Sequence, residues 1–139
     1  MGKTTASLWF IPVLAVLLAA CGGGGGKETL VDPNTPPSNY KQEILNLLTK
    51  TLDDATNVHD AFISDPVLTQ VGSDQRFTLC IRYNGRNMEG EYAGSKERVA
   101  YFFGGHLNQL VEADKGQCAK VVYKPFPELE KLCQAAKCN

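Results

Sequence analysis

The sequence predicts an α+β fold, in which one N-terminal helix packs on a small antiparallel sheet of three to five strands with a disulfide-stapled tail. Three patterns support it. Apolar residues recur at helical spacing in residues 38–55, they alternate with polar residues in 77–83, and a Gly-Gly pair separates two apolar stretches. With 139 residues and a net charge of -1, we expect one domain. No basic excess marks a nucleic-acid binder.

The helix expected over residues 38–55 has one apolar face. Ser38 or Asn39 can cap its start, and Gln42 stands in capping-box position after Asn39. We expect the face to pack on the sheet, and a partner-binding helix is the alternative. The residues of this face are Tyr40, Ile44, Leu47, Leu48, Leu52 and Ala55.

The rest of the chain predicts strands separated by turns. Gly104 and Gly105 supply the positive φ angles of a two-residue hairpin turn, and one long strand with a glycine kink is the alternative. After Pro125-Phe126-Pro127 we expect a short helix over residues 128–136. The expected strands are residues 58–64, 77–83, 99–103, 107–111 and 119–123.

The first twenty residues read as an export signal. Lys3 provides a positive charge, and the apolar run of residues 8–20 is shorter than the ~20 residues of a spanning helix. The run ends Leu18-Ala19-Ala20-Cys21, which resembles the lipobox of bacterial lipoproteins. An ordinary secretory signal with an incidental cysteine is the alternative.

The lipobox resemblance implies a lipid anchor. Cys21 would become the first mature residue and carry a thioether-linked diacylglycerol and an amide-linked acyl chain such as palmitate. Gly22, where sorting to the inner membrane favours Asp, implies the outer membrane, with the protein facing the periplasm. We therefore expect a signal peptide in 1–20, an acylated Cys and Gly/Pro-rich tether in 21–37, and the folded domain in 38–139.

Four cysteines remain besides Cys21. An even count in an exported domain predicts two disulfides, for which three connectivities exist. We favour Cys118–Cys133, which leaves Cys80–Cys138; a free Cys80 with one tail bridge is the alternative. No Cys-x2-Cys pair occurs, so we expect no metal site and no cofactor.

The expected loop of residues 82–98 mixes Arg, Tyr, Asn and Gly, a composition typical of contact surfaces; it is either a mobile hairpin connection, which we favour, or a contact surface. Phe126, between two prolines, is either a core plug, which we favour, or a docking residue. Neither His59 nor His106 belongs to a catalytic motif, and no catalytic residue is predicted. The candidate partner-binding residues are Arg82, Tyr83, Arg86, Tyr92, Arg98 and Phe126.

The 82–98 stretch and the Pro-Phe-Pro-Glu tail also resemble small lipoproteins of Gram-negative envelopes. This resemblance implies no activity and no functional residue beyond Cys21. We expect a lipid-anchored, non-catalytic binding or scaffolding domain whose partner is another envelope protein. The alternative is an inhibitor of an envelope-targeting hydrolase, either a lysozyme or a protease.

Overall fold

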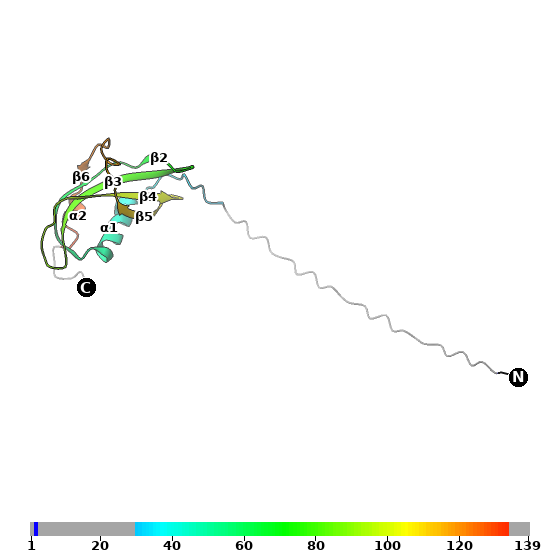
Figure 1. The fold of residues 1–139 in the computed structure, drawn as a ribbon, viewed down its shortest axis with the longest axis horizontal. Coiled ribbons are helices and arrows are strands. Elements are labelled where there is room, and N and C mark those ends of the chain that lie inside the picture. Colours follow the sequence, from blue (N-terminus) through cyan, green and yellow to red (C-terminus); the bar gives the residue numbers. More distant parts are fainter. Residues whose placement is uncertain (1, 3–29, 134–139) are drawn as a thin grey trace.

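A computed structural model describes Gly2 and residues 30–133 (Figure 1). A helix comes first, five longer strands follow, and a very short strand and a second helix close the described chain. The elements are α1 (Tyr40–Thr51), β1 (Asp54–Ile63), β2 (Val67–Val71), β3 (Asp74–Arg86), β4 (Lys96–Phe103), β5 (His106–Glu112), β6 (Lys124–Pro125) and α2 (Pro127–Glu130).

The predicted α+β fold with three to five strands is wrong. The described chain is mainly a six-stranded antiparallel sheet, and its helices have only 12 and four residues. Helix α1 ends at Thr51 because Leu52 adopts an extended backbone (φ -73°, ψ 138°), and β1 begins two residues later. Two strands were not predicted: β2 lacks a clear apolar alternation, and β6 has only two residues.

Strand β3 organises the sheet. The strand order is β5-β4-β3-β1-β6, and β2 also pairs with β3. Strands β1 and β2 share one edge of β3 in succession: Phe62 and Ile63 lie opposite Arg82 and Ile81, whereas Val67–Val71 lie opposite Thr78–Asp74. One edge of β3 is therefore covered by two separate strands, of which β1 pairs further with β6 and β2 does not.

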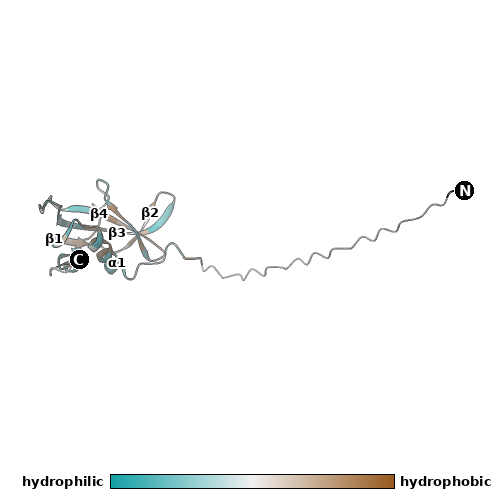
Figure 2. Ribbon diagram, turned by 90° about the horizontal axis from the view of Figure 1, so that it is seen from below, coloured by the Kyte–Doolittle hydropathy of each residue, from teal (hydrophilic) through white to brown (hydrophobic). Residues whose placement is uncertain are grey.

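The two faces of the sheet carry separate apolar clusters. Both helices contribute to the larger cluster, on the face where Leu79 and Ile81 point, and Figure 2 shows apolar stretches on the strands near α1. Cys80 belongs to a smaller cluster with Val99 and Cys118, so it faces away from its neighbours, as the strand alternation predicted. The larger cluster comprises Ile44, Leu45, Leu48, Val58, Ala61, Ile63, Leu79, Ile81, Tyr83, Ala100, Phe102, Phe126 and Leu129.

The predicted Gly104–Gly105 hairpin is confirmed. Phe103 pairs with His106, and both glycines have positive φ (58° and 83°). The segment before α1 packs against this turn: the Gly104 N–H donates to the Pro33 carbonyl at 3.2 Å, and Pro37 is buried. Contacts with the sheet thus begin before residue 38, where the sequence analysis placed the start of the domain.

Other predicted elements differ at their ends. The N-cap of α1 is Asn39, but its side chain makes no capping bond, and Gln42 instead donates to Asn46 at 2.9 Å. Residues 119–123 form no strand, because the chain is in a turn up to residue 120 and pairs only from Lys124. The helix expected over 128–136 is α2, which ends at Glu130; residues 134–136 lie outside the described residues.

Candidate functional site

A disulfide crosses from the centre of the sheet to the segment after β5. Cys80 and Cys118 are bonded, with their Cα atoms 6.0 Å apart. The predicted pairing Cys118–Cys133 is therefore wrong, and so is Cys80–Cys138. Residues 114–120 turn back over the face that carries Cys80, and the linear spacing of the cysteines could not show this path. Cys133 is also disulfide-bonded, and Cys138 lies outside the described residues.

This disulfide anchors one wall of a groove of about 640 Å³. The floor is the face of the sheet opposite α1, formed by β2, β3 and β4, and residues 117–122 form a wall over it. Most of the lining is apolar, as is common for ligand sites of this size. The lining includes Val67, Thr69, Val71, Thr78, Val99, Tyr101, Gln117, Lys120, Val121 and Val122.

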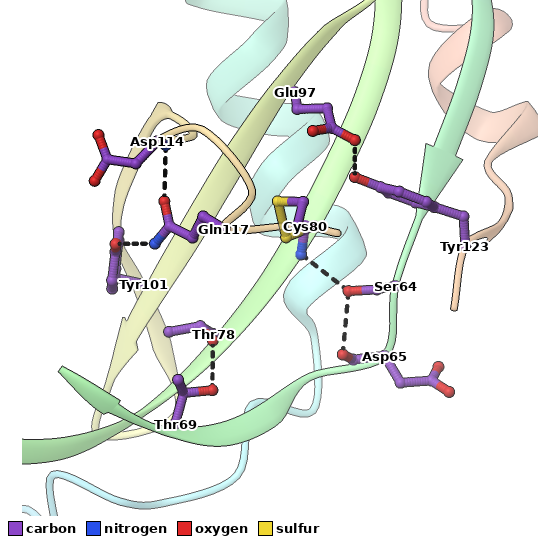
Figure 3. Close-up of a disulfide and its surroundings, with 11 residues drawn as sticks. Ser64, Asp65, Thr69, Thr78, Cys80, Glu97, Tyr101, Asp114, Gln117 and Tyr123 are labelled. Carbon is purple, nitrogen blue, oxygen red and sulfur yellow. Dashed lines mark hydrogen bonds between the residues drawn. A yellow bond between two sulfur atoms is a disulfide. The ribbon is translucent and has the colours of Figure 1, made fainter. Parts of the chain in front are cut away.

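Side-chain hydrogen bonds hold the groove in shape (Figure 3). The hydroxyls of Thr69 and Thr78 lie 2.9 Å apart across β2 and β3. Gln117 donates to the Tyr101 hydroxyl at 2.8 Å, which fixes the wall to β4. The Ser64 hydroxyl accepts the N–H of Cys80 at 2.9 Å, beside the disulfide. These hydrogen bonds fix the floor and the wall relative to each other.

Few charges border the groove. Lys120 lines it and has no ion-pair partner within residues 30–133. Asp65 also lines it, but this carboxylate binds Lys124 at 2.5 Å. Lys120 is therefore the lining cation left unpaired in the described structure, and it favours an acidic group in an occupant.

Beyond the groove, the same face carries a stacked arginine. The Arg82 guanidinium lies 4.9 Å from the ring centroids of both Phe62 and Tyr123. Tyr123 donates to the Glu97 carboxylate at 3.0 Å. Burial, together with this hydrogen bond and the negative charge of Glu97, raises the pKa of Tyr123 to about 12. This cluster is bonded internally, and we interpret it as structural.

The structure does not gather the predicted partner-binding residues on one surface. Arg82 is stacked on the groove face, whereas Tyr83 is 4% exposed and belongs to the core on the opposite face. Arg98 lies over the Tyr83 ring at 5.9 Å. Strand β3 extends to Arg86, so much of the predicted loop is strand. Tyr83 is excluded as a contact residue because it is buried.

The remaining candidates also make internal contacts. Arg86 lies 5.2 Å from the Tyr92 ring and 3.9 Å from the Asp54 carboxylate, and Tyr92 donates to the Asn57 carbonyl at 2.6 Å. Phe126 is fully buried, which confirms the favoured core plug and excludes a docking residue. A small hollow of about 170 Å³ touches Tyr83, Arg86 and Arg98, and the Tyr83 hydroxyl is buried without a hydrogen-bond partner in the described structure.

Both histidines lie at the surface, and each contacts one neighbouring side chain. The His59 ring is 5.2 Å from the Tyr92 ring, and His106 Nδ1 is 2.9 Å from the Glu43 carboxylate. Within residues 30–133, no three His, Cys, Asp or Glu side chains are placed to hold a metal ion. No described helix is long and apolar enough to cross a membrane. Cys21, the predicted lipidation site, lies outside the described residues.

The fold and groove together define a small antiparallel β domain with one open, mainly apolar site. Comparison of the chain with protein families, curated proteins and solved structures found no match. The groove was not predictable from local patterns, because three strands form its floor and its wall is a segment that was predicted to be a strand. The one available signal was the polar turn of residues 114–117, which could have indicated a chain reversal before Cys118.

Proposed function

We propose that this protein is a lipid-anchored cell-envelope protein whose folded domain binds a partner, without catalysis, in the groove between β2 and residues 117–122. One observation carries the proposal: the groove has about 640 Å³ of open space over the sheet, and a disulfide and a side-chain hydrogen bond hold its wall in place. Preformed concave sites with apolar linings and a few polar groups are where proteins usually bind ligands.

The chemistry of the lining supports binding rather than turnover. Its polar side chains are hydroxyls, amides, one lysine and one ion-paired aspartate. Neither histidine lines it, so the lining has no imidazole base of the kind that most often activates a nucleophile. The lipid anchor rests on the lipobox at Cys21 and would keep the groove near a membrane surface.

Two matched valines can test the groove in cells. Val122 lines it and is 77% exposed, whereas Val111 is 41% exposed on β5 and lies outside it. A photo-cross-linking amino acid at position 122 should give a discrete adduct in the envelope, and the same group at 111 should not. Equal adducts from both positions, or none from 122, would contradict the groove as the binding site.

The anchor needs a separate experiment. Labelled palmitate should enter the wild-type protein and should be absent from Cys21→Ser. If the label persisted in Cys21→Ser, the lipidation site would be elsewhere. The hydrolase-inhibitor alternative stays a prediction, and adding the purified protein to lysozyme and serine-protease assays tests it directly.

A further inference from the structure

The outer edge of β2 has no partner in the described structure. Strand β2 pairs with β3 alone, and no backbone hydrogen bond joins its other edge to any segment within residues 30–133. Exposed strand edges are normally protected by charges, proline, bulges or a covering segment. The five residues Val67–Val71 contain no charge and no proline. This edge is therefore open to pairing with another strand.

The register identifies the backbone groups that are free. Val71 pairs with Asp74 across a two-residue turn that begins at Gly72, whose φ is 62°. In such a hairpin the closing pair exchanges both hydrogen bonds, and the bonded residues then alternate along the strand. The N–H and C=O groups of Leu68 and Gln70 consequently point away from β3, toward the open edge.

The space beside this edge is one that the chain itself could have filled. Ile63 pairs with Lys124, so a longer β6 running back through residues 119–123 would have lain beside the chain that leads into β2. The Cys80–Cys118 bond instead draws this segment over the face of the sheet. The segment becomes the groove wall, and the edge it leaves unpaired borders the groove.

We propose that the open edge of β2 takes an extended peptide of a partner protein as an added strand, with the peptide's alternate side chains in the groove. This inference rests on the proposed function and names the kind of partner. Backbone pairing would give affinity, and the groove would select side chains. Val67, Val71 and Val121 favour an uncharged segment with apolar residues at alternate positions, and Lys120 favours an acidic residue at one end.

A single peptide fits this site better than a second copy of the domain. Residues 117–122 bound the groove that would receive the side chains of the added strand, so a second folded sheet would have to approach this wall, whereas one extended chain can lie beside it. Five residues of β2 would pair with a peptide stretch of similar length, which spans roughly 17 Å at about 3.4 Å per residue. Self-association is thus an outcome that the experiment must exclude.

The test uses the full-length protein in nanodiscs and a synthetic heptapeptide of alternating threonine and valine that ends in glutamate. Amide exchange is followed by NMR. We expect the peptide to slow exchange of the Leu68 and Gln70 amides about tenfold or more, because these donors gain an acceptor. The Val67, Thr69 and Val71 amides already bond β3 and should change less.

Two variants of one residue isolate the backbone contribution. Gln70→Pro removes an outward N–H, whereas Gln70→Ala keeps it, and both lose the same side-chain bond to the Gly72 carbonyl. The peptide should bind Gln70→Ala and should bind Gln70→Pro at least about tenfold more weakly. In both variants, wild-type NMR shifts for Cys80, Cys118 and their neighbours would show that the domain stays folded.

Three results would overturn the inference. Peptide-induced shifts in the groove without slower exchange at Leu68 and Gln70 would mean that side chains alone hold the peptide, and the proposed binding groove would stand. The absence of any shift would also reject strand addition. In that case, cross-linking from position 122 still tests separately whether the groove binds a partner. Slow exchange at both amides without peptide, together with a concentration-dependent dimer, would show that a second copy fills the edge.

Discussion

Val31 packs directly against Gly104 at the β4–β5 turn. A Cβ atom on residue 104 would lie 2.4 Å from Val31 Cγ1, closer than such atoms approach in proteins. The segment expected to be a free tether is thus in contact with the domain at its last residues. This contact holds the segment before α1 at the turn end of the sheet.

Gly104→Ala should therefore destabilise the domain more than glycine replacement at an open turn. Gly72 is the matched control: its φ is 62°, close to the 58° of Gly104, and a Cβ there meets nothing within 4 Å. We expect a cost of about 1–2 kcal/mol for Gly72→Ala from backbone strain, and about 1–3 kcal/mol more for Gly104→Ala from overlap with Val31. Urea unfolding of the full chain measures both.

A second substitution separates strain from overlap. Val31→Ala removes Cγ1 and leaves the Val31 Cβ, which stands 3.7 Å from the Cβ built on residue 104. In the Gly104→Ala background it should return the cost to that of Gly72→Ala. Equal costs for the two glycine variants, with no rescue, would show that residues 30–37 do not pack on the turn.

Loss of the Cys80–Cys118 disulfide should destabilise the protein and open the groove. The bond closes a sequence separation of 38 residues, and disulfides of this kind typically contribute ~2–4 kcal/mol. The double variant Cys80→Ala/Cys118→Ala should unfold at lower urea, and its residue-122 cross-link should fall. An intact cross-link at full yield in a destabilised variant would mean that hydrogen bonds such as Gln117–Tyr101 position the wall without the disulfide.

Local patterns predicted the parts of this fold that short-range physics determines. The apolar spacing found α1, the alternation found the core of β3, and the glycine pair found the β4–β5 hairpin, because each depends on neighbouring residues. The ends of the elements were predicted less accurately. Helix α1 stops at Thr51, and residue 55, its predicted end, already lies in β1.

The features that depend on chain path were not predictable in this way. The partner of Cys80 follows from the reversal after β5, and the exposure of the β2 edge follows from the departure of residues 119–123 from the sheet. The candidate contact residues failed for a related reason. Composition suggested a surface in 82–98, but strand alternation sends Tyr83 into the core and Arg82 to the other face.

The Glu43 carboxylate should make stability depend on acid pH. Burial acts to raise its pKa, but hydrogen bonds from the Leu107 N–H and from His106, with the charge of His106, outweigh burial and lower it. A carboxyl whose pKa is lower in the folded state stabilises above its unfolded pKa of about 4.3, and this stabilisation is lost as pH falls through the folded pKa.

Glu43→Gln measures that contribution. The stability difference from wild type that is measured at pH 5 should shrink as pH falls below about 4. His106→Ala keeps the Leu107 bond and should retain part of the effect. A difference that did not change with pH would mean that the amide substitutes fully for the carboxylate, so the charge of Glu43 contributes nothing.

Tyr123 should ionise late in alkaline titration. Burial first, and then the hydrogen bond and charge of Glu97, raise its pKa to about 12. Because the folded state holds this proton more tightly, the resulting stabilisation is complete below the unfolded pKa of about 10 and is lost as pH rises toward 12. The phenolate absorbance that disappears in Tyr123→Phe identifies the Tyr123 transition.

Glu97→Gln tests the cause of this shift. It removes the negative charge but leaves an amide oxygen to accept the Tyr123 hydroxyl, so the pKa of Tyr123 should fall while the stacking of Arg82 on Tyr123 remains. If Tyr123 instead titrated near 10 in the wild type, its hydroxyl would be solvated. The Tyr123–Glu97 hydrogen bond would then contribute nothing to the position of the chain that enters β6.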